Sequence, residues 1–304
     1  MPIVVLLIAA STVGLLVGLA VRRYPRLAPA HAPPATEVAR EVGETARRHP
    51  RLRAIVAPRL DPATATGLAL TAALVLAIGG GVLLGVLAYL ARTKSSLIGF
   101  DNGVAKWGNR HASPWSTHVL DGITQLGSVY TVLGLSVLLA VVETIRQRTV
   151  WVVAFIVATL GGEEIITPAV KHLVDRTRPT FNPAAATLGP SFPSGHSATA
   201  AVFYATAALL LGRGRPRAVR AVLAGLAAGI AVAVAASRVL LDVHWLSDVI
   251  GGLALGWSWF AVCGIAFGGR ILRFGAAAEV AARTAGEGVS VPASAPQVRR
   301  GQRT

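Results

Sequence analysis

Seven long hydrophobic runs constrain the fold of this chain more than any other feature of its sequence. They span residues 3–21, 67–91, 119–142, 149–170, 197–212, 221–237 and 249–268. A helix needs roughly 20 apolar residues to cross the hydrocarbon core of a bilayer. Because 53% of the residues are hydrophobic and only 14% are charged, a soluble globular protein is excluded. We therefore predict an all-α protein, a polytopic bundle of membrane helices.

Two of the runs carry further information about where their helices begin. The run 197–212 is short, and it reaches membrane length only if its helix begins at Pro193 or Ser194. The first run has no basic residue before it and no small-residue cleavage pattern, and Arg22 and Arg23 follow it. These features favour a retained membrane anchor, with its amino end outside, over a cleaved signal peptide.

The basic residues are distributed unevenly between the hydrophobic runs. The formal charge is +15, and 21 of the 29 basic residues lie in stretches 22–66, 143–148, 213–220 and 270–304. Stretches 92–118, 171–196 and 238–248 hold the other eight. Cytoplasmic loops are enriched in Lys and Arg, so the first group is predicted to be cytoplasmic and the second extracytoplasmic, in the plasma membrane. The charge is explained without a nucleic-acid partner, and none is expected.

These observations divide the chain into four parts. Residues 1–23 form the anchor, and residues 24–66 form a Pro- and Arg-rich cytoplasmic linker, predicted to lie along the anionic inner leaflet with a short helix over 37–48. Residues 67–268 form the membrane domain, and 269–304 a disordered basic tail. The single cysteine, Cys263, cannot form an internal disulfide and is expected in the core.

Three polar clusters stand out among the extracytoplasmic loops. Their patterns are Lys171-x6-Arg178-Pro179, Pro193-Ser194-Gly195-His196 and Ser237-Arg238-x5-His244-x3-Asp248. The cations Lys171, Arg178 and Arg238 share one membrane face and suit a ligand with several anionic oxygens, above all phosphate. Ser194 and Gly195 open a helix, whose free amides and dipole favour the same anion.

The two histidines of these clusters fit complementary roles. If the last helix begins near His244, Asp248 lies on the same face four residues later and accepts a hydrogen bond from one imidazole nitrogen. The other nitrogen is then free to attack phosphorus as a nucleophile. His196, at the start of its helix, is placed to protonate the departing oxygen as a general acid.

The three ordered clusters resemble the signatures of the type 2 phosphatidic acid phosphatase superfamily. The resemblance covers about 67–268 and implies a six-helix phosphatase core, with the first helix as an addition. It also implies metal-independent hydrolysis of a phosphoester or diphosphate, with no cofactor. By position, Lys171, Arg178, Ser194, Gly195 and Arg238 bind phosphate, His196 is the general acid, His244 the nucleophile and Asp248 its partner.

The same residues allow three other interpretations. A metal site at His196 and His244, completed by Asp175, Asp242 or Asp248, is disfavoured because three converging cations repel a divalent metal. A non-enzymatic phospholipid binder or transporter explains the arginines but not an oriented imidazole pair. A vanadium-dependent peroxidase shares the three clusters by resemblance but rarely needs seven spans.

Acidic residues within the hydrophobic runs are costly and need a partner. Glu163 and Glu164 fall near the middle of a span, and Glu164 lies two turns before Lys171. It is therefore predicted to pair with a site cation; the alternatives are that the acids line a water-filled vestibule or lie nearer the outer surface. Asp121 and Gln125 share a helix face and are interpreted as polar contacts between helices. Asp242 adds a negative charge close to the anion site, and His118 is interpreted as a surface residue.

The loop between the first two clusters, residues 181–192, is weakly polar, which favours a lipid-borne phosphate. The resemblance allows polyprenyl diphosphate, phosphatidic acid and phosphatidylglycerol phosphate. An outward-facing site favours an undecaprenyl-type polyprenyl diphosphate, because a carrier diphosphate is released there during assembly of wall polymers. No obligatory protein partner is evident.

Overall fold

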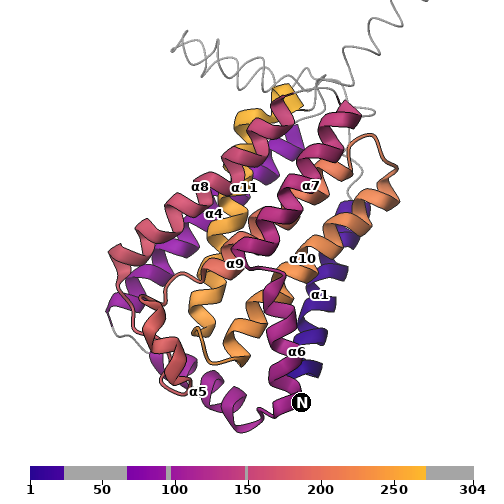
Figure 1. The fold of residues 1–304 in the computed structure, drawn as a ribbon. Coiled ribbons are helices and arrows are strands. Elements are labelled where there is room, and N and C mark those ends of the chain that lie inside the picture. Colours follow the sequence, from indigo (N-terminus) through magenta and orange to yellow (C-terminus); the bar gives the residue numbers. More distant parts are fainter. Residues whose placement is uncertain (24–66, 94–96, 148–149, 272–304) are drawn as a thin grey trace, which may run out of the picture.

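The computed structural model describes residues 1–23, 67–93, 97–147 and 150–271 (Figure 1). The elements are α1 (Pro2–Arg23), α4 (Gly67–Arg92), α5 (Leu97–Arg110), α6 (Pro114–Gln125), α7 (Val129–Gln147), α8 (Trp151–Val174), the 3-10 helix η3 (Pro183–Leu188), α9 (Gly195–Leu211), α10 (Arg217–Leu240) and α11 (Leu246–Ile271). Over the described ranges the chain is helical and has no strand, which confirms the predicted all-α bundle. The predicted linker, its short helix and most of the tail lie outside these ranges.

Six helices are long and apolar enough to cross a membrane: α1, α4, α7, α8, α10 and α11. Their outward faces carry many exposed large hydrophobic side chains, as a lipid environment requires. The remaining predicted span, over 197–212, corresponds to α9, which has 17 residues, a length of about 26 Å at 1.5 Å per residue. It begins at Gly195, one residue after the expected start, and its N-cap Ser194 is fully buried. The helix therefore starts beneath the surface of the bundle.

The predicted helix over 119–142 is wrong, because the chain breaks between α6 and α7. The break falls at residues 126–128, and the hydroxyl of Ser128 accepts a hydrogen bond from the amide of Thr131 in the first turn of α7. A Cβ atom on Gly127 would lie 2.5 Å from the Val234 side chain and 2.8 Å from the carbonyl oxygen of His196. Hydropathy did not reveal the break, because glycine and serine interrupt a helix without adding charge.

Small residues hold α9 against α11 at the centre of the bundle. A Cβ atom on Gly252 would lie 2.4 Å from the carbonyl oxygen of Ser194, and one on Gly256 would lie 2.4 Å from that of Ala198. Such contacts require glycine and allow two membrane helices to approach at their backbones. The start of α9 is therefore set by packing against α11, the helix that carries Asp248.

Helix α1 packs along α10 in the opposite direction. A Cβ atom on Gly14 would lie 2.7 Å from the carbonyl oxygen of Gly225, and a Cβ atom on Gly225 would lie 2.7 Å from the carbonyl oxygen of Gly14. Gly18 and Gly229 extend the contact in both directions. The first helix is therefore a packed part of the bundle. The amino terminus lies at the same end of the bundle as α5 and the start of α6 (Figure 1).

Candidate active site

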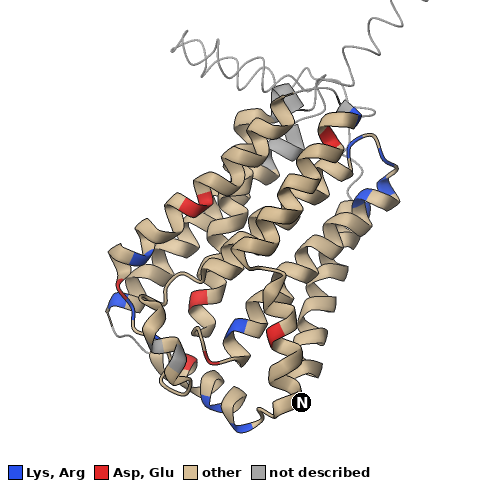
Figure 2. Cartoon of the chain, viewed as in Figure 1, with Lys and Arg blue, Asp and Glu red and all other residues tan. Residues whose placement is uncertain are grey.

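The three sequence clusters meet at one end of the bundle. They come from the end of α8 and the loop after it, the start of α9, the end of α10 and the loop into α11. Figure 2 shows acidic and basic residues from several helices at this end of the bundle. The Lys171 ammonium donates to the carbonyl of Pro190 at 2.8 Å, and Arg178 donates to those of Gly189 and Val243, each at 2.8 Å. Both cations therefore contact the loop that leads to α9.

His244 is buried between a cation and a carboxylate. Its Nε2 lies 3.2 Å from Nη1 of Arg178, and its Nδ1 lies 3.5 Å from Oδ2 of Asp248. Arginine only donates, so Nε2 is the acceptor and the ring proton belongs on Nδ1, toward Asp248. Burial lowers the pKa of His244 to about 4, although Asp248 acts in the opposite direction. The imidazole is therefore neutral at neutral pH, with its lone pair beside a phosphate-binding candidate.

The contact between His244 and Asp248 does not arise in the predicted way. Helix α11 begins at Leu246, so the two residues do not share one helical face. Instead, Oδ2 of Asp248 accepts the backbone amide of Trp245 at 2.9 Å, which closes the loop immediately before the helix. The capping interaction brings the carboxylate back toward the imidazole.

The start of α9 forms the second wall of the site. The Ser194 amide donates to the Asp248 carbonyl at 3.0 Å, and the Ser194 hydroxyl accepts from Ser197 at 2.9 Å. The first amides of a helix have no intrahelical acceptors, so this end of α9 can bind an anion. His196 lies in the first turn, partly buried, and Gly195 precedes it.

Arg238 is held by a helix that the sequence did not predict to contribute. Its Nη1 donates to the hydroxyl of Thr124 on α6 at 3.1 Å, and its guanidinium is buried. Its Nε is buried without a hydrogen-bond partner among the described residues, which leaves a donor for a ligand. Thr124 falls just before the break at 126–128, and a hydropathy pattern gave no signal for it.

Two further residues of the site, Arg176 and Asp101, were missed. Arg176 lies within the first cluster and is buried, with its Nη1 2.7 Å from Oδ1 of Asp248 and its Nη2 2.7 Å from Oδ2 of Asp101. Asp101 lies on α5, in a stretch interpreted only as a loop. The position of Arg176 inside a cluster rich in cations was the available signal, and no pattern identified the partner of its charge.

The two intramembrane acids lie in different surroundings. The carboxylate of Glu163 is fully buried and accepts hydrogen bonds from Thr167 of α8 at 2.7 Å and Thr199 of α9 at 3.1 Å. It therefore links the helix of Lys171 to the helix of His196 through hydroxyl groups. Glu164 is exposed, and in the described part of the chain neither acid forms an ion pair with a site cation.

Asp242 forms the turn at the end of α10. Its φ of 53° lies in the left-handed region, which Asp tolerates better than most residues. Burial raises the pKa of its carboxyl to about 6. Asp175 also adopts a left-handed conformation, at the end of α8, and is exposed. Within the described ranges, no three His, Cys, Asp or Glu side chains lie together as a set of metal ligands.

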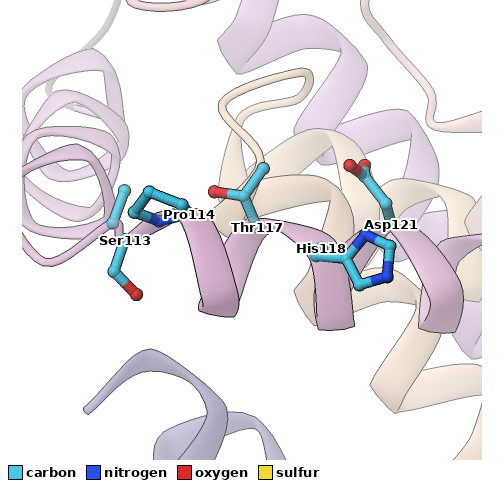
Figure 3. A pocket seen from close by; sticks show the side chains of 6 residues that line it. Ser113, Pro114, Thr117, His118 and Asp121 are labelled. Atoms are coloured by element: carbon cyan, nitrogen blue, oxygen red, sulfur yellow. The ribbon is translucent and has the colours of Figure 1, made fainter.

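A cavity of about 520 Å³ opens beside α6 (Figure 3). Its lining consists of Ala112, Ser113, Pro114, Thr117, His118 and Asp121. Asp121 is exposed in this cavity, and its charge acts on Arg238 at the end of α10, in keeping with the predicted polar interaction between helices. The cavity lies one helical turn from Thr124, the contact of Arg238 on the same helix.

Comparison with known proteins agrees with this geometry. The sequence model of the PAP2 superfamily matches residues 149–271, which include all three clusters. Phosphatidylglycerophosphatase B of Bacillus subtilis is 33% identical over 161 residues, which cover 51% of this chain and 77% of that protein. Lipid A 1-phosphatase of Rhizobium etli is 32% identical over 135 residues, and the chain spans only about half of its length (54%).

A solved structure supports the same relationship at the level of the fold. A transmembrane PAP2-type phosphatidylglycerolphosphate phosphatase from Bacillus subtilis matches with a TM-score of 0.59 and 29% identity. The match covers 66% of this chain and 99% of that one. These relatives are phosphatases, which favours the enzyme over the non-enzymatic lipid binder and the peroxidase. The chain thus belongs to the PAP2 superfamily and is a multi-span membrane lipid phosphatase.

Proposed function

We propose that the protein hydrolyses a lipid-borne phosphate or diphosphate through a phosphohistidine at His244, without a metal ion. The observation that carries this proposal is the placement of His244 between Arg178 and Asp248. The unprotonated Nε2 adjoins a cation that suits phosphate, and Nδ1 faces the carboxylate. A buried, neutral and oriented imidazole has the features of an activated nucleophile.

The proposed reaction has two steps with balanced atoms. Nε2 of His244 attacks phosphorus, the bond from phosphorus to the lipid oxygen breaks, and His196 transfers a proton to that oxygen. His196 then accepts a proton from water, which attacks the phosphohistidine and releases inorganic phosphate. Lys171, Arg178, Arg238 and the first amides of α9 stabilise the charge of the transferred group throughout.

Different observations favour each of two candidate substrates. Three cations and a helix terminus offer more positive charge than one phosphate requires, which favours a polyprenyl diphosphate. The similarity to phosphatidylglycerophosphatase B favours phosphatidylglycerol phosphate as the second candidate. Release of phosphate from both lipids and from phosphatidic acid, assayed with purified protein in detergent, decides between them. A kcat/KM for phosphatidylglycerol phosphate above that for the diphosphate would reject the first choice.

The same assay tests the chemistry. Hydrolysis should survive excess chelator and be inhibited by vanadate, which mimics five-coordinate phosphorus. When the protein reacts with an activated aryl phosphate, rapid quenching should trap a phosphoprotein whose bond to phosphate is acid-labile. Loss of activity in chelator that a divalent ion restores would overturn the metal-independent mechanism.

We further propose that the site opens on the extracytoplasmic side of the plasma membrane. The distribution of basic residues supports this orientation, and the amino terminus lies at the same end of the bundle as the site. Single cysteines at Leu188 and Val219, both exposed side chains, on a Cys263→Ala background, can be probed in intact cells with an impermeant maleimide. Leu188→Cys should react and Val219→Cys should not, and the reverse pattern would invert the topology.

A further inference from the structure

Arg176 lies two residues before Arg178 but contacts a different part of the site. Its Nη1 donates to Oδ1 of Asp248 at 2.7 Å and to the hydroxyl of Ser247 at 2.6 Å, and its Nη2 donates to Oδ2 of Asp101 at 2.7 Å. The residue is only 8% exposed. One guanidinium therefore joins a carboxylate on α5 to a carboxylate on α11. Removing either partner leaves a buried charge without compensation.

Asp101 also fixes the first turn of α11 directly. Its Oδ1 accepts from the amide of Ser247 at 3.0 Å, and its Oδ2 accepts from the hydroxyl of the same residue. The Asp101 side chain is 1% exposed, although α5 carries charged residues on its outer face. A buried carboxylate whose oxygens are all engaged holds α5 in register with the helix that carries Asp248.

Both oxygens of Asp248 have defined partners as a result. Oδ1 accepts from Arg176, while Oδ2 accepts the amide of Trp245 and lies 3.5 Å from Nδ1 of His244. The ring of Trp245 also lies 5.5 Å from the guanidinium carbon of Arg176. These contacts leave the carboxylate one orientation, with its second oxygen toward the imidazole.

The charges of this group give the arrangement a chemical consequence. If Arg176 paired with Asp248 alone, the pair would be neutral and would offer little stabilisation to a positive imidazole. The second carboxylate, Asp101, cancels the charge of Arg176. The group of three then carries one net negative charge, next to an imidazole that becomes cationic when it bonds to phosphorus. Buried charges at short range interact strongly enough for this difference to affect a reaction barrier.

We propose that Arg176 and Asp101 form a positioning pair that fixes the Asp248 carboxylate toward His244 and leaves its negative charge available to the imidazolium of the phosphoenzyme. The pair does not touch the substrate and acts through Asp248. This inference rests on the proposed function, in which His244 is the nucleophile.

Opposite charge changes at the two partners provide the test. Asp101→Asn removes a negative charge behind His244 and should lower the pKa of the imidazole, whereas Arg176→Gln removes a positive charge and should raise it. The pH profile of kcat/KM reports ionisations of the free enzyme. Its acidic limb should therefore move to lower pH in Asp101→Asn and to higher pH in Arg176→Gln, by roughly 0.5 to 1 pH unit. The ionisation of the substrate is the same in all variants.

Other charged groups near His244 are unchanged in both variants. Arg178 faces the imidazole from the loop after α8, Asp248 from α11, and Lys171 and His196 act on it from α8 and α9. Because the phosphate-binding cations are intact, KM should stay within about 3-fold, while kcat falls by roughly 10- to 100-fold. Arg110→Gln on the exposed end of α5 and Asp175→Asn at the exposed end of α8 are matched controls that should leave both parameters unchanged.

A purely structural role for the pair predicts a different pattern. Both variants would then lose activity with no shift, or with shifts in one direction, and either result would overturn the proposal. If Arg176→Gln does not fold, Arg176→Lys keeps the charge without the planar fork. Arg176→Lys should lower kcat without moving the acidic limb of the pH profile, while Asp101→Asn should still move that limb to lower pH. An acidic limb that moves in Arg176→Lys, or that does not move in Asp101→Asn, would overturn the proposal.

The failure of this inference can be separated from failure of the proposed function. Phosphoprotein trapped from His244→Ala would contradict His244 as the nucleophile and would remove the basis for both. If the trapped phosphate depends on His244 but the two acidic limbs do not diverge, the proposed function stands and the positioning pair is rejected.

Discussion

The two histidines of the site are held in contrasting ways. His244 lies in a loop, buried, and a chain of charged and polar groups behind it runs through Asp248 and Arg176 to Asp101 on another helix. His196 lies in the first turn of α9, and among the described residues no side chain forms a hydrogen bond with its imidazole. One imidazole is oriented by an ion network and the other by the backbone of a helix.

This difference matches the chemistry proposed for each residue. A nucleophile needs one fixed tautomer, because only an unprotonated Nε2 can attack phosphorus. A general acid that later acts as a base must exchange its proton with two partners, so a permanent side-chain partner would compete with both. The comparison predicts that damage to the two halves of the site has different consequences for the two chemical steps.

The largest effect is expected on the nucleophile side. His244→Ala should abolish phosphoenzyme formation from every substrate, a loss on the order of 10⁴-fold or more in kcat. Asp248→Asn should be a weaker version of this lesion, since it disturbs the tautomer without removing the nucleophile. Rapid-quench trapping of radiolabelled phosphoprotein measures both variants. Equal loss in His244→Ala and Asp248→Asn would indicate that orientation is as important as the nucleophile itself.

Loss of the general acid should depend on the leaving group. His196→Ala should lose roughly 10²–10⁴-fold in rate on a lipid substrate, because an alkoxide leaves poorly without a proton. A nitrophenolate needs no proton, so the variant should still form phosphoenzyme from nitrophenyl phosphate. The ratio of the two rates is the measurement. If His196→Ala is as inactive as His244→Ala toward nitrophenyl phosphate, the two roles have been assigned wrongly.

The contrast also explains how far the sequence could predict the site. Long hydrophobic runs and three compact clusters are local patterns, and they predicted the helical bundle and the residues that the bundle brings together. Arg176 and Asp101 are 75 positions apart, and their pairing depends on how α5 folds across the end of the bundle. A nearby aspartate could be matched to His244 from its spacing, but no spacing rule connects residues on separate helices.

The break between α6 and α7 escaped prediction for a related reason. Gly127 and Ser128 are compatible with a membrane helix, and only the packing of Gly127 against the backbone of His196 shows why the chain bends there. Thr124, which contacts Arg238, then depends on this bend for its position. Hydropathy patterns indicate whether a helix is surrounded by lipid or by water, but they do not indicate which neighbouring groups pack against its backbone.

A moderate effect, confined to the part of the site that holds the general acid His196, is expected from Gly127→Ala. The added Cβ atom would lie 2.8 Å from the carbonyl oxygen of His196, so the first turn of α9 must shift at a cost of about 1–3 kcal/mol. Lipid hydrolysis should fall by roughly 10-fold, while phosphoenzyme formation from nitrophenyl phosphate changes little. Gly122→Ala on α6, where nothing lies within 4 Å, is the matched control. Equal loss on both substrates would show that the two halves are mechanically coupled.

The smallest effect on catalysis is expected where α1 meets α10, far from both histidines. In Gly14→Leu the new side chain would start 2.7 Å from the carbonyl oxygen of Gly225, which forces the helices apart and lowers stability by about 1–3 kcal/mol. The residual activity after heating in detergent should drop at a lower temperature, whereas kcat/KM at 25 °C should stay within about 3-fold. Gly79→Leu on α4 faces open space and should change neither. If kcat/KM falls in Gly14→Leu as far as in Gly127→Ala, α1 takes part in positioning Arg238 at the end of α10, and its role extends beyond stability.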